Sequence, residues 1–375
     1  MNTEIVSVRG RRIWDSRGRP TVEVDITLAD GTRGRGMAPA GASRGRFEAV
    51  DLRDGGDAFG GFGVAKALTN IAGPIAETIV GMDATDQQAI DEALASRDGT
   101  TNFSSLGGNA VIAVSMAALN ASAAATGQPL WRYLAGDSPV RLPLPEIQIF
   151  GGGAHAGRRV DIQDFLIMPI GAASFDEALA MAAEVYRAAG KLMDSKGNQV
   201  GVADEGGWWP AFDTNEAGLD ALARSIETAG FRNGEVAISL DVAASEFGKD
   251  GRYRLNLDDK VLETGEWLDM LHGWIERFPI ISLEDPVGED DPKGMQAFTA
   301  AVGDRVQIIG DDFLVTDAER VMAAARNNAC NAVLLKPNQA GTITGMRHAL
   351  NAARSADWGT ILSARSGETE DVTIA

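Results

Sequence analysis

Five charged residues end five short apolar runs in the second half of the chain. The runs are VAISLD, IISLED, QIIGDD, AVLLKP and TILSARS, which end at or near Asp241, Glu284, Asp311, Lys336 and Arg365. Carboxylates are the oxygen ligands that Mg²⁺ prefers, lysine can act as a base, and arginine binds anions through a planar fork of donors. Together these residue types predict a Mg²⁺ site beside a base and an anion-binding group.

The apolar runs predict the strands that must position these residues. Each run is short and does not alternate with polar residues, which is typical of a strand buried on both faces. Helical spacing lies between them, for example over 317–327 and 343–354. Repeated strand–helix–strand units imply parallel pairing, in a (β/α) barrel or a doubly wound sheet. In a barrel the chemistry lies at the carboxyl ends of the strands, where these charges stand.

Composition limits the possible functions. The 375 residues suffice for a barrel and a smaller domain, and the net charge of −19 argues against a nucleic-acid partner. Residues 1–53 differ, with ten arginines against seven acids, a net +3, which leaves −22 for the remainder. We find no signal-peptide core and no apolar run near the ~20 residues of a membrane span. Cys330 is the single cysteine, so we expect a cytoplasmic protein.

The first 140 residues predict a small α+β domain. Strands are expected over 5–14, 21–28 and 32–38, with a hairpin turn at Asp30-Gly31, and helices over 64–79, 86–95 and 109–125. Between them, residues 40–49 form a glycine-containing loop that is either a plain connector or a lid over a substrate. A proline-rich connector suggests a domain boundary near 140, and hence domains 1–140 and 141–375.

Three further segments carry candidate site residues. His155 lies among four nearby glycines, which is unlike a packed core histidine and favours a role in a site. Gln163 and Asp164 stand at the start of a strand expected over 161–170. Glu205 belongs to an Asp–Glu pair that runs into a double glycine, which again resembles the end of a barrel strand.

Nine segments, in order along nearly the whole chain, resemble the enolase (phosphopyruvate hydratase) family. They are WDSRGRPTVEV, GAS at 41–43, GGGAHAG, ADEGG, LDVAASEF, SLEDP, IIGDD, LLKPNQAGT and SARSGETED. The resemblance implies an α+β capping domain followed by a modified (β/α)8 enolase-type barrel, which is an α/β fold. It also implies two Mg²⁺ ions and a small anionic substrate related to phosphoenolpyruvate. We further expect a homodimer or higher homo-oligomer, with no nucleic-acid or membrane partner.

The resemblance also implies roles for single residues. Lys336 matches the base that removes the proton alpha to the substrate carboxylate, and Glu205 matches the acid that helps the 3-hydroxyl to leave. Asp164 is the third residue expected to be catalytic. The metal ligands that it implies are Asp241, Glu284, Asp311 and, on the lid, Ser43. The substrate-binding residues are His155, Gln163, Arg365 and Ser366.

Several departures from the family pattern bear on the reaction. Asp164 replaces a glutamate, Ala364 replaces a histidine, and Arg44 and Arg46 add positive charge to the lid, where they could bind a second anion. The two replaced groups serve carbon 3 of the substrate, whereas the metal, base and phosphate groups are retained. We therefore expect an enzyme that joins an anionic phosphonate to phosphoenolpyruvate, like the carboxyphosphonoenolpyruvate synthases of phosphinate biosynthesis.

Two alternatives to that expectation stay open. The first is an ordinary phosphopyruvate hydratase that tolerates the substitutions, and the second is a non-catalytic relative kept for binding or structure. The retained carboxylates, Lys336 and Glu205 argue against the second, because a scaffold has no use for clustered like charges. The family continues after the segment SGETEDVTIA with a helix, a last barrel strand and a substrate-binding lysine, so we expect the natural chain to extend beyond Ala375.

Overall fold

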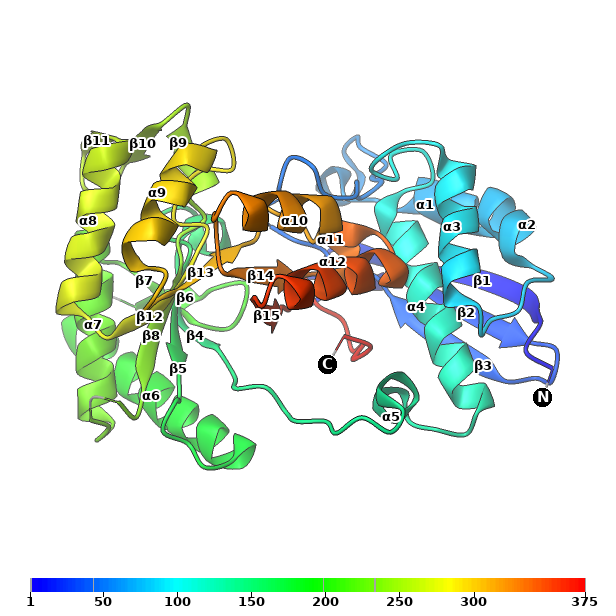
Figure 1. Cartoon of the computed structure of the whole chain (residues 1–375), viewed down its shortest axis with the longest axis horizontal. Coiled ribbons are helices and arrows are strands. Elements are labelled where there is room, and N and C mark those ends of the chain that lie inside the picture. The colour runs from blue at the N-terminus through cyan, green and yellow to red at the C-terminus, as the bar shows by residue number, and fades with distance from the viewer. Residues whose placement is uncertain (1, 43, 198, 233, 375) are drawn as a thin grey trace.

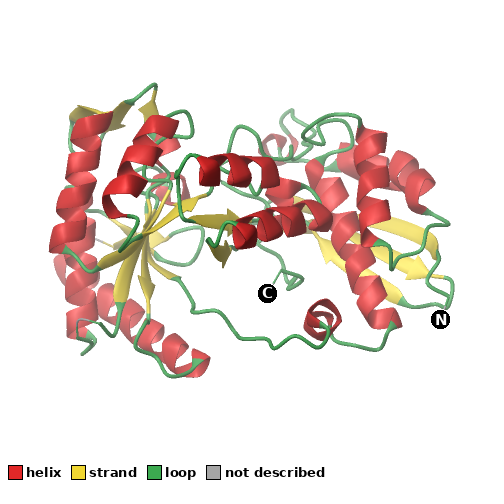
Figure 2. Cartoon of the chain, viewed as in Figure 1, coloured by secondary structure: helices red, strands yellow, loops and turns green. Residues whose placement is uncertain are grey.

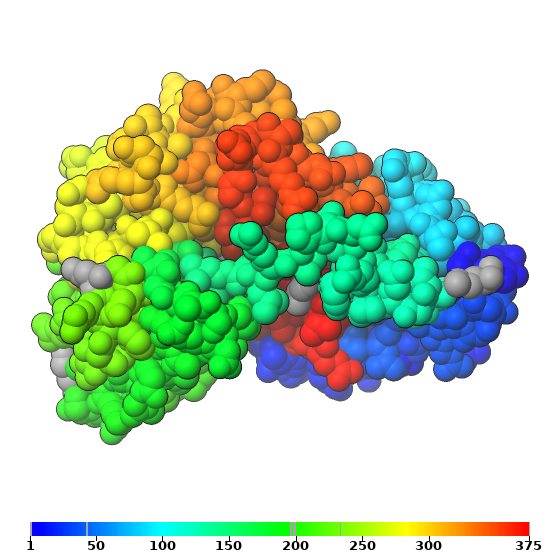
Figure 3. Space-filling model, turned by 60° about the horizontal axis from the view of Figure 1, so that its bottom comes forward, coloured from blue at the N-terminus to red at the C-terminus, as the bar shows by residue number. Residues whose placement is uncertain are grey.

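The computed structural model describes residues 2–42, 44–197, 199–232 and 234–374. The molecule has an N-terminal part and a larger part built on a sheet (Figure 1). Each part has its own hydrophobic cluster, one formed mainly by residues 5–121 and the other by residues 149–353. Residues 139–146 join the two parts without regular structure and run along the surface between them (Figure 3).

The N-terminal part packs helices on an antiparallel sheet in the order β1-β2-β3. The expected hairpin turn at Asp30-Gly31 joins β2 to β3, and a π-helical turn (Ile71–Ile75) that contains Pro74 joins α1 to α2. The elements are β1 (Ile5–Trp14), β2 (Pro20–Leu28), β3 (Arg33–Met37), α1 (Ala65–Asn70), α2 (Ala76–Ile79), α3 (Gln87–Asp98), α4 (Gly108–Ala125) and α5 (Leu130–Ala135).

Helix α4 is the core helix of this part. By length and composition alone it could cross a membrane, but 83% of it is buried inside the protein. Its small residues allow a close approach to β3, where the backbone of Ala117 and Ala121 lies against Gly34. The helix is therefore apolar on all sides because it is enclosed by protein.

Within the described residues, the larger part contains a sheet of nine strands, in the order β15-β14-β13-β12-β8-β5-β4-β7-β6, with helices along its outer side (Figure 2). Its strands are β4 (Ile147–Gly151), β5 (Asp164–Met168), β6 (Gln199–Val202), β7 (Trp208–Pro210), β8 (Ala237–Asp241), β12 (Ile280–Glu284), β13 (Gln307–Gly310), β14 (Ala332–Leu335) and β15 (Gly359–Leu362). The five expected apolar runs are β8 and β12 to β15, and they pair in parallel as predicted.

The remaining elements connect and cover these strands. A small separate sheet of β9 (Gly248–Lys249), β10 (Arg252–Leu255) and β11 (Lys260–Glu263) follows β8. The helices are α6 (Phe175–Lys196), α7 (Asn215–Thr228), α8 (Thr264–Arg277), α9 (Pro292–Val302), α10 (Ala318–Arg326), α11 (Pro337–Ala340) and α12 (Ile343–Ser355).

Strand β5 runs antiparallel to both of its neighbours, β4 and β8. Its first residue, Asp164, is therefore paired with Asp241, the last residue of β8. The strand is shorter than the 161–170 expected from the sequence. Because of its direction, its beginning lies at the same edge of the sheet as the carboxyl ends of the parallel strands.

A buried polar network joins the two parts at the start of α12. The Asp91 carboxylate of α3 accepts a hydrogen bond from the Thr344 N–H (2.9 Å), and the Ser115 hydroxyl oxygen of α4 accepts one from the Ile343 N–H (3.0 Å). Helix N-termini have N–H groups without partners inside the helix, so these side chains cap α12 from the other part. The cap fixes the helix that connects β14 to β15.

Candidate active site

The carboxyl-end rim of the sheet carries the charged residues found in the sequence. Asp241 and Glu284 are the last residues of β8 and β12 and lie opposite each other in the parallel pair. Asp311 follows β13 directly, and Lys336 follows β14 directly. Arg365 lies three residues beyond β15. The strand ends thus bring together the residues that the sequence predicted to meet.

These residues and their neighbours surround a cavity of about 60 Å³. The residues that line it are His155, Gln163, Asp164, Leu166, Glu205, Asp241, Glu284, Lys336, Ser363, Ala364, Arg365 and Ser366. Nine of the thirteen residues proposed from the sequence are among them.

Lys336 lies in a buried ion pair. Its Nζ is 2.5 Å from Asp311 Oδ2, and Asp311 Oδ1 accepts a hydrogen bond from Gln339 Nε2 (2.8 Å). Burial acts to lower the pKa of Lys336, but the charge and hydrogen bond of Asp311 and the charge of Glu284 act together to raise the pKa above its usual value. The lysine must therefore release this ion pair before it can act as a base.

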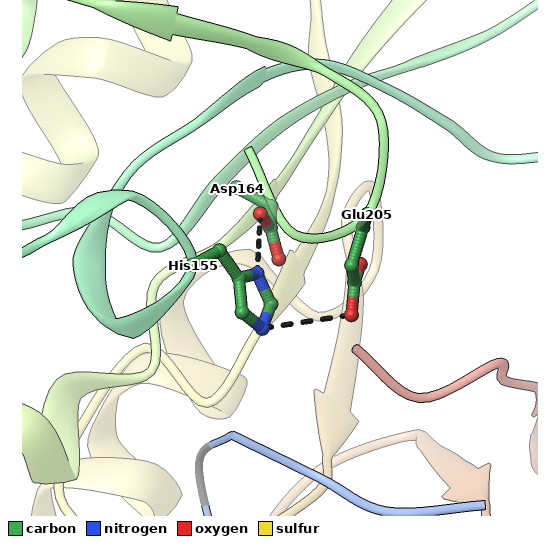
Figure 4. Close-up of side chains that lie close together, drawn as sticks. All are labelled: His155, Asp164 and Glu205. Carbon is green, nitrogen blue, oxygen red and sulfur yellow. Dashed lines mark hydrogen bonds and ion pairs between the residues drawn. The ribbon is translucent and has the colours of Figure 1, made fainter. Parts of the chain in front are cut away.

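His155 lies between two acids that also line the cavity, Asp164 and Glu205 (Figure 4). Its Nδ1 lies 2.9 Å from Asp164 Oδ1, and its Nε2 lies 3.5 Å from Glu205 Oε1. Burial lowers the pKa of His155, but Asp164 and Glu205 outweigh it and raise the pKa to about 9. Burial and the neighbouring Asp164 raise the pKa of Glu205 to about 7. At neutral pH Glu205 can therefore hold a proton, which a general acid requires.

The cluster of acids at the rim suits a divalent cation. Burial and mutual repulsion raise the pKa values of Asp241 and Glu284 well above the ordinary range. A cation that prefers oxygen ligands would relieve this repulsion, so the donor set fits a hard divalent ion. Asp241 is already oriented, because Gln163 Nε2 donates to its Oδ2 (2.7 Å) and the Ala243 N–H donates to its Oδ1 (2.9 Å).

The three proposed ligands are not the closest group of acids. Among the described residues, two groups have ligand atoms that all lie within 4.8 Å of one another: His155, Asp164 and Glu205, and Asp285, Asp311 and Asp312. Asp285 is occupied by the backbone, since it accepts hydrogen bonds from the N–H groups of Asp311 (3.0 Å) and Asp312 (2.6 Å). Asp285 thereby positions Asp311, and the ligand set Asp241, Glu284 and Asp311 stays a prediction.

Three described residues proposed from the sequence do not line this cavity: Arg44, Arg46 and Asp311, whose Oδ2 pairs with the cavity residue Lys336. Arg44 lies 3.7 Å from Asp51, and the Arg46 backbone N–H donates to Glu289 (3.1 Å). Ser43, the proposed ligand of a second metal ion, lies outside the described residues. The guanidinium of Arg46 lies over the Phe47 ring, and the role of both arginines in binding a second anion stays a prediction.

Several site residues were not identified from the sequence. Glu48 pairs with Arg365 (Oε2 to Nη1, 3.0 Å), and Gln148 donates to Asp164. Gln339, which bonds Asp311, belongs to the segment LLKPNQAGT, and its place three residues after Lys336 was a usable signal. The sequence around Glu48 and Gln148 gave no comparable signal, and only the fold brings these two residues to the site.

Comparison with known families and proteins covers nearly the whole chain. The model described as "Enolase, N-terminal domain" matches residues 5–134, and "Enolase, C-terminal TIM barrel domain" matches residues 139–375. The chain is also similar to "Enolase 1" of Desulfitobacterium hafniense (strain Y51). The two are 47% identical over 375 residues, which span 99% of this chain and 86% of the relative.

The acidic rim predicts that Mg²⁺ stabilises the fold. Millimolar Mg²⁺ added to EDTA-treated protein should raise Tm by a few degrees, because an ion that binds only the folded state adds stability by mass action. Asp241→Asn should lose most of this increase. Differential scanning fluorimetry measures it, and Glu216→Gln, which alters an acid paired with Arg277 far along the surface, is the control. Equal increases in both variants would place the ion elsewhere.

The pair of His155 and Asp164 predicts a pH-dependent stability. The folded pKa of about 9 exceeds the ordinary value of 6.5, so the stabilisation is complete below about pH 6.5 and is lost as the pH rises through 9. Between pH 8 and 10 the metal-free wild type should lose roughly 1 kcal/mol more than His155→Gln. Urea unfolding at several pH values tests this, and parallel curves for the two proteins would contradict it.

Proposed function

The chain belongs to the enolase family, and we propose that it is a phosphopyruvate hydratase, which removes water from 2-phosphoglycerate to form phosphoenolpyruvate. Enolases are Mg²⁺-dependent carbon–oxygen lyases, so the chain is an enzyme. The relative named "Enolase 1" supports this reaction over the phosphonate-using synthase that we expected from the sequence.

One observation carries the proposal. A single cavity has Lys336 beside the acids of the rim and Glu205, with its raised pKa, beside His155. Removal of water needs a base for the proton on carbon 2 and an acid for the hydroxyl on carbon 3. Lys336 and Glu205 are of the right types for these two tasks.

The residues around the cavity would divide the work as follows. Lys336 takes the proton alpha to the substrate carboxylate once it leaves the ion pair with Asp311. Glu205 donates a proton to the departing hydroxyl, and His155 and Asp164 hold Glu205 in place. Arg365 and Ser366 bind the phosphoryl group. Mg²⁺, when bound by the acids at the rim, supplies positive charge against the negative charge that develops on the substrate carboxylate.

The proposal predicts that Lys336→Ala is inactive while still folded and able to bind Mg²⁺. Loss of a general base costs about 10²–10⁴ in rate, so formation of phosphoenolpyruvate, followed by its absorbance, should fall at least 10²-fold. Exchange of the carbon-2 proton with deuterium should fall equally. The Mg²⁺-induced increase in Tm should remain, as a control for the fold. Undiminished exchange in the variant would show that another group is the base.

The phosphonate-using synthase remains a second candidate because Ala364 lines the cavity. At this position the family has a histidine, whereas this chain has only the methyl side chain of alanine, which leaves space near carbon 3 of the substrate. Two of the features that suggested this candidate, Arg44 and Arg46, do not line the cavity. The structure therefore supports it less than the sequence did.

Turnover of 2-phosphoglycerate separates the two candidates. A hydratase should turn over at about 10–10² per second with excess Mg²⁺, the usual range of metabolic enzymes. The double change Asp164→Glu with Ala364→His should then leave the rate within about tenfold of the wild type. Negligible wild-type turnover that this double change raises at least 10²-fold would instead favour the synthase.

A further inference from the structure

A buried arginine of the N-terminal part, Arg17, contacts one of the two residues that we assign to the phosphoryl group. It belongs to the segment WDSRGRPTVEV, in which the sequence indicated no site residue. Its Nη1 donates a hydrogen bond to Ser366 Oγ (3.3 Å), and its Nη2 donates to the Ala40 carbonyl (2.8 Å). Only 6% of its side chain is exposed. Arg17 does not line the cavity, so its contact with the site is made through Ser366.

The segment that follows β15 lies close against the N-terminal part at this point. The backbones of Ala40 and Gly367 exchange two hydrogen bonds, each of 2.9 Å. A Cβ atom at Gly367 would collide with the side chains of Asp15 and Arg17. Because residue 367 is a glycine, the guanidinium group of Arg17 can come close enough to bond the hydroxyl of the preceding residue.

The hydroxyl of Ser366 has both of its acceptor positions filled. Besides the bond from Arg17, Oγ accepts one from the Ala42 N–H (2.7 Å). A serine hydroxyl has two acceptor lone pairs and one proton to donate. Among the described residues no acceptor takes that proton, and Ser366, which is 3% exposed, lines the cavity. The bonding capacity left to the hydroxyl is therefore that of a donor, which is what a phosphoryl oxygen requires.

Two acids hold the guanidinium group of Arg17 in this orientation. Asp15 Oδ2 lies 3.3 Å from Nη2, and Asp15 Oδ1 accepts a hydrogen bond from the Arg17 N–H (2.9 Å). Asp204 Oδ2 lies 3.9 Å from Nη1. A charged donor makes a stronger hydrogen bond than a neutral one, and it polarises the group that it bonds. Arg17 thus makes the hydroxyl of Ser366 a better donor.

We propose that Arg17 is a positioning residue that makes Ser366 a dedicated hydrogen-bond donor to the phosphoryl group of the substrate. Together with the Ala42 N–H, it occupies the acceptor positions of the hydroxyl and turns its proton toward the cavity. A group that only accepts hydrogen bonds, such as a fully ionised phosphoryl group, is thereby favoured at this position. The inference rests on the proposed function only in assigning Ser366 to the phosphoryl group.

A purely structural role for Arg17 makes a different prediction. In that case Arg17 would only hold the segment after β15 on the N-terminal part, and its loss would lower Tm without a specific effect on anion binding. If Arg17 acts through Ser366, its effect on anion affinity must disappear when the hydroxyl is absent. A double-mutant cycle on the two residues therefore separates the roles.

The affinity for inorganic phosphate, measured by titration calorimetry with Mg²⁺ present, tests the proposal. Ser366→Ala should raise the Kd at least about tenfold, because it removes a hydrogen bond to a charged group. Arg17→Met should raise the Kd about fivefold, since it weakens that bond. The double variant should lie within about twofold of Ser366→Ala alone. Arg17→Lys keeps one charged donor and should recover part of the loss, and it provides the same cycle if Arg17→Met does not fold.

Arg53→Met is the matched control. Arg53 is a second buried arginine of the N-terminal part, and it pairs with the aspartate two positions before it, Asp51 (3.0 Å), as Arg17 pairs with Asp15. It also donates to a backbone carbonyl, that of Pro20 (2.6 Å). Neither Arg53 nor Asp51 lines the cavity. The control variant should lower Tm about as much as Arg17→Met but leave the Kd for phosphate unchanged.

Three results would overturn the proposal. They are a phosphate affinity that does not depend on Ser366, an equal loss of affinity in Arg53→Met, and an effect of Arg17→Met that persists undiminished in the Ser366→Ala background. No arm of the experiment uses turnover. A wild type without hydratase turnover whose phosphate affinity depends on Arg17 through Ser366 would refute the proposed function alone. An active hydratase whose phosphate affinity does not depend on Arg17 would refute this inference alone.

Discussion

The burial of several carboxylates at one edge of a sheet is the constraint on which the rest of the structure depends. Asp241, Glu284 and Asp311 are each less than a tenth exposed, and isolated buried charges are strongly unfavourable. The protein places cations among them, with Lys336 on Asp311 and Arg365 close by. The same burial shifts pKa values, and shifted pKa values are what acid–base chemistry at neutral pH requires. Burial of the carboxylates therefore accounts both for the placement of the cations and for the shifted pKa values that the proposed chemistry uses.

Both parts of the fold contribute residues to this buried site. Parallel strands deliver Asp241 and Glu284 to the rim at their carboxyl ends, and β5 delivers Asp164 to the same rim because it runs the opposite way. The N-terminal part then closes the site, through the lid contacts to Ser366 and Arg365. Each part alone would lack groups that the other supplies, which explains why the two are joined by buried polar contacts.

The comparison with enolases changed the favoured reaction but not the assigned groups. The expectation of a phosphonate co-substrate rested on Asp164, on Ala364 and on the two arginines of the lid. In the structure Asp164 is held by His155 and Gln148, so the shorter carboxylate still takes part in an ordered network. Arg44 lies 3.7 Å from Asp51, and the guanidinium of Arg46 lies over the Phe47 ring. The replacement of the family's glutamate by Asp164 thus leaves this position hydrogen-bonded within the site.

The sequence by itself determined the strands, the charges at their ends and the family, because these depend on local patterns. A strand buried on both faces is a short apolar run, and the residue that ends it lies at the rim wherever the sheet is parallel. Only the tertiary structure decided which distant groups meet. It placed Asp164 at the rim through an antiparallel strand, brought Glu48 to Arg365 and left Arg44 and Arg46 outside the lining of the cavity. Contacts between residues hundreds of positions apart leave no local pattern, since they arise from packing of the whole chain.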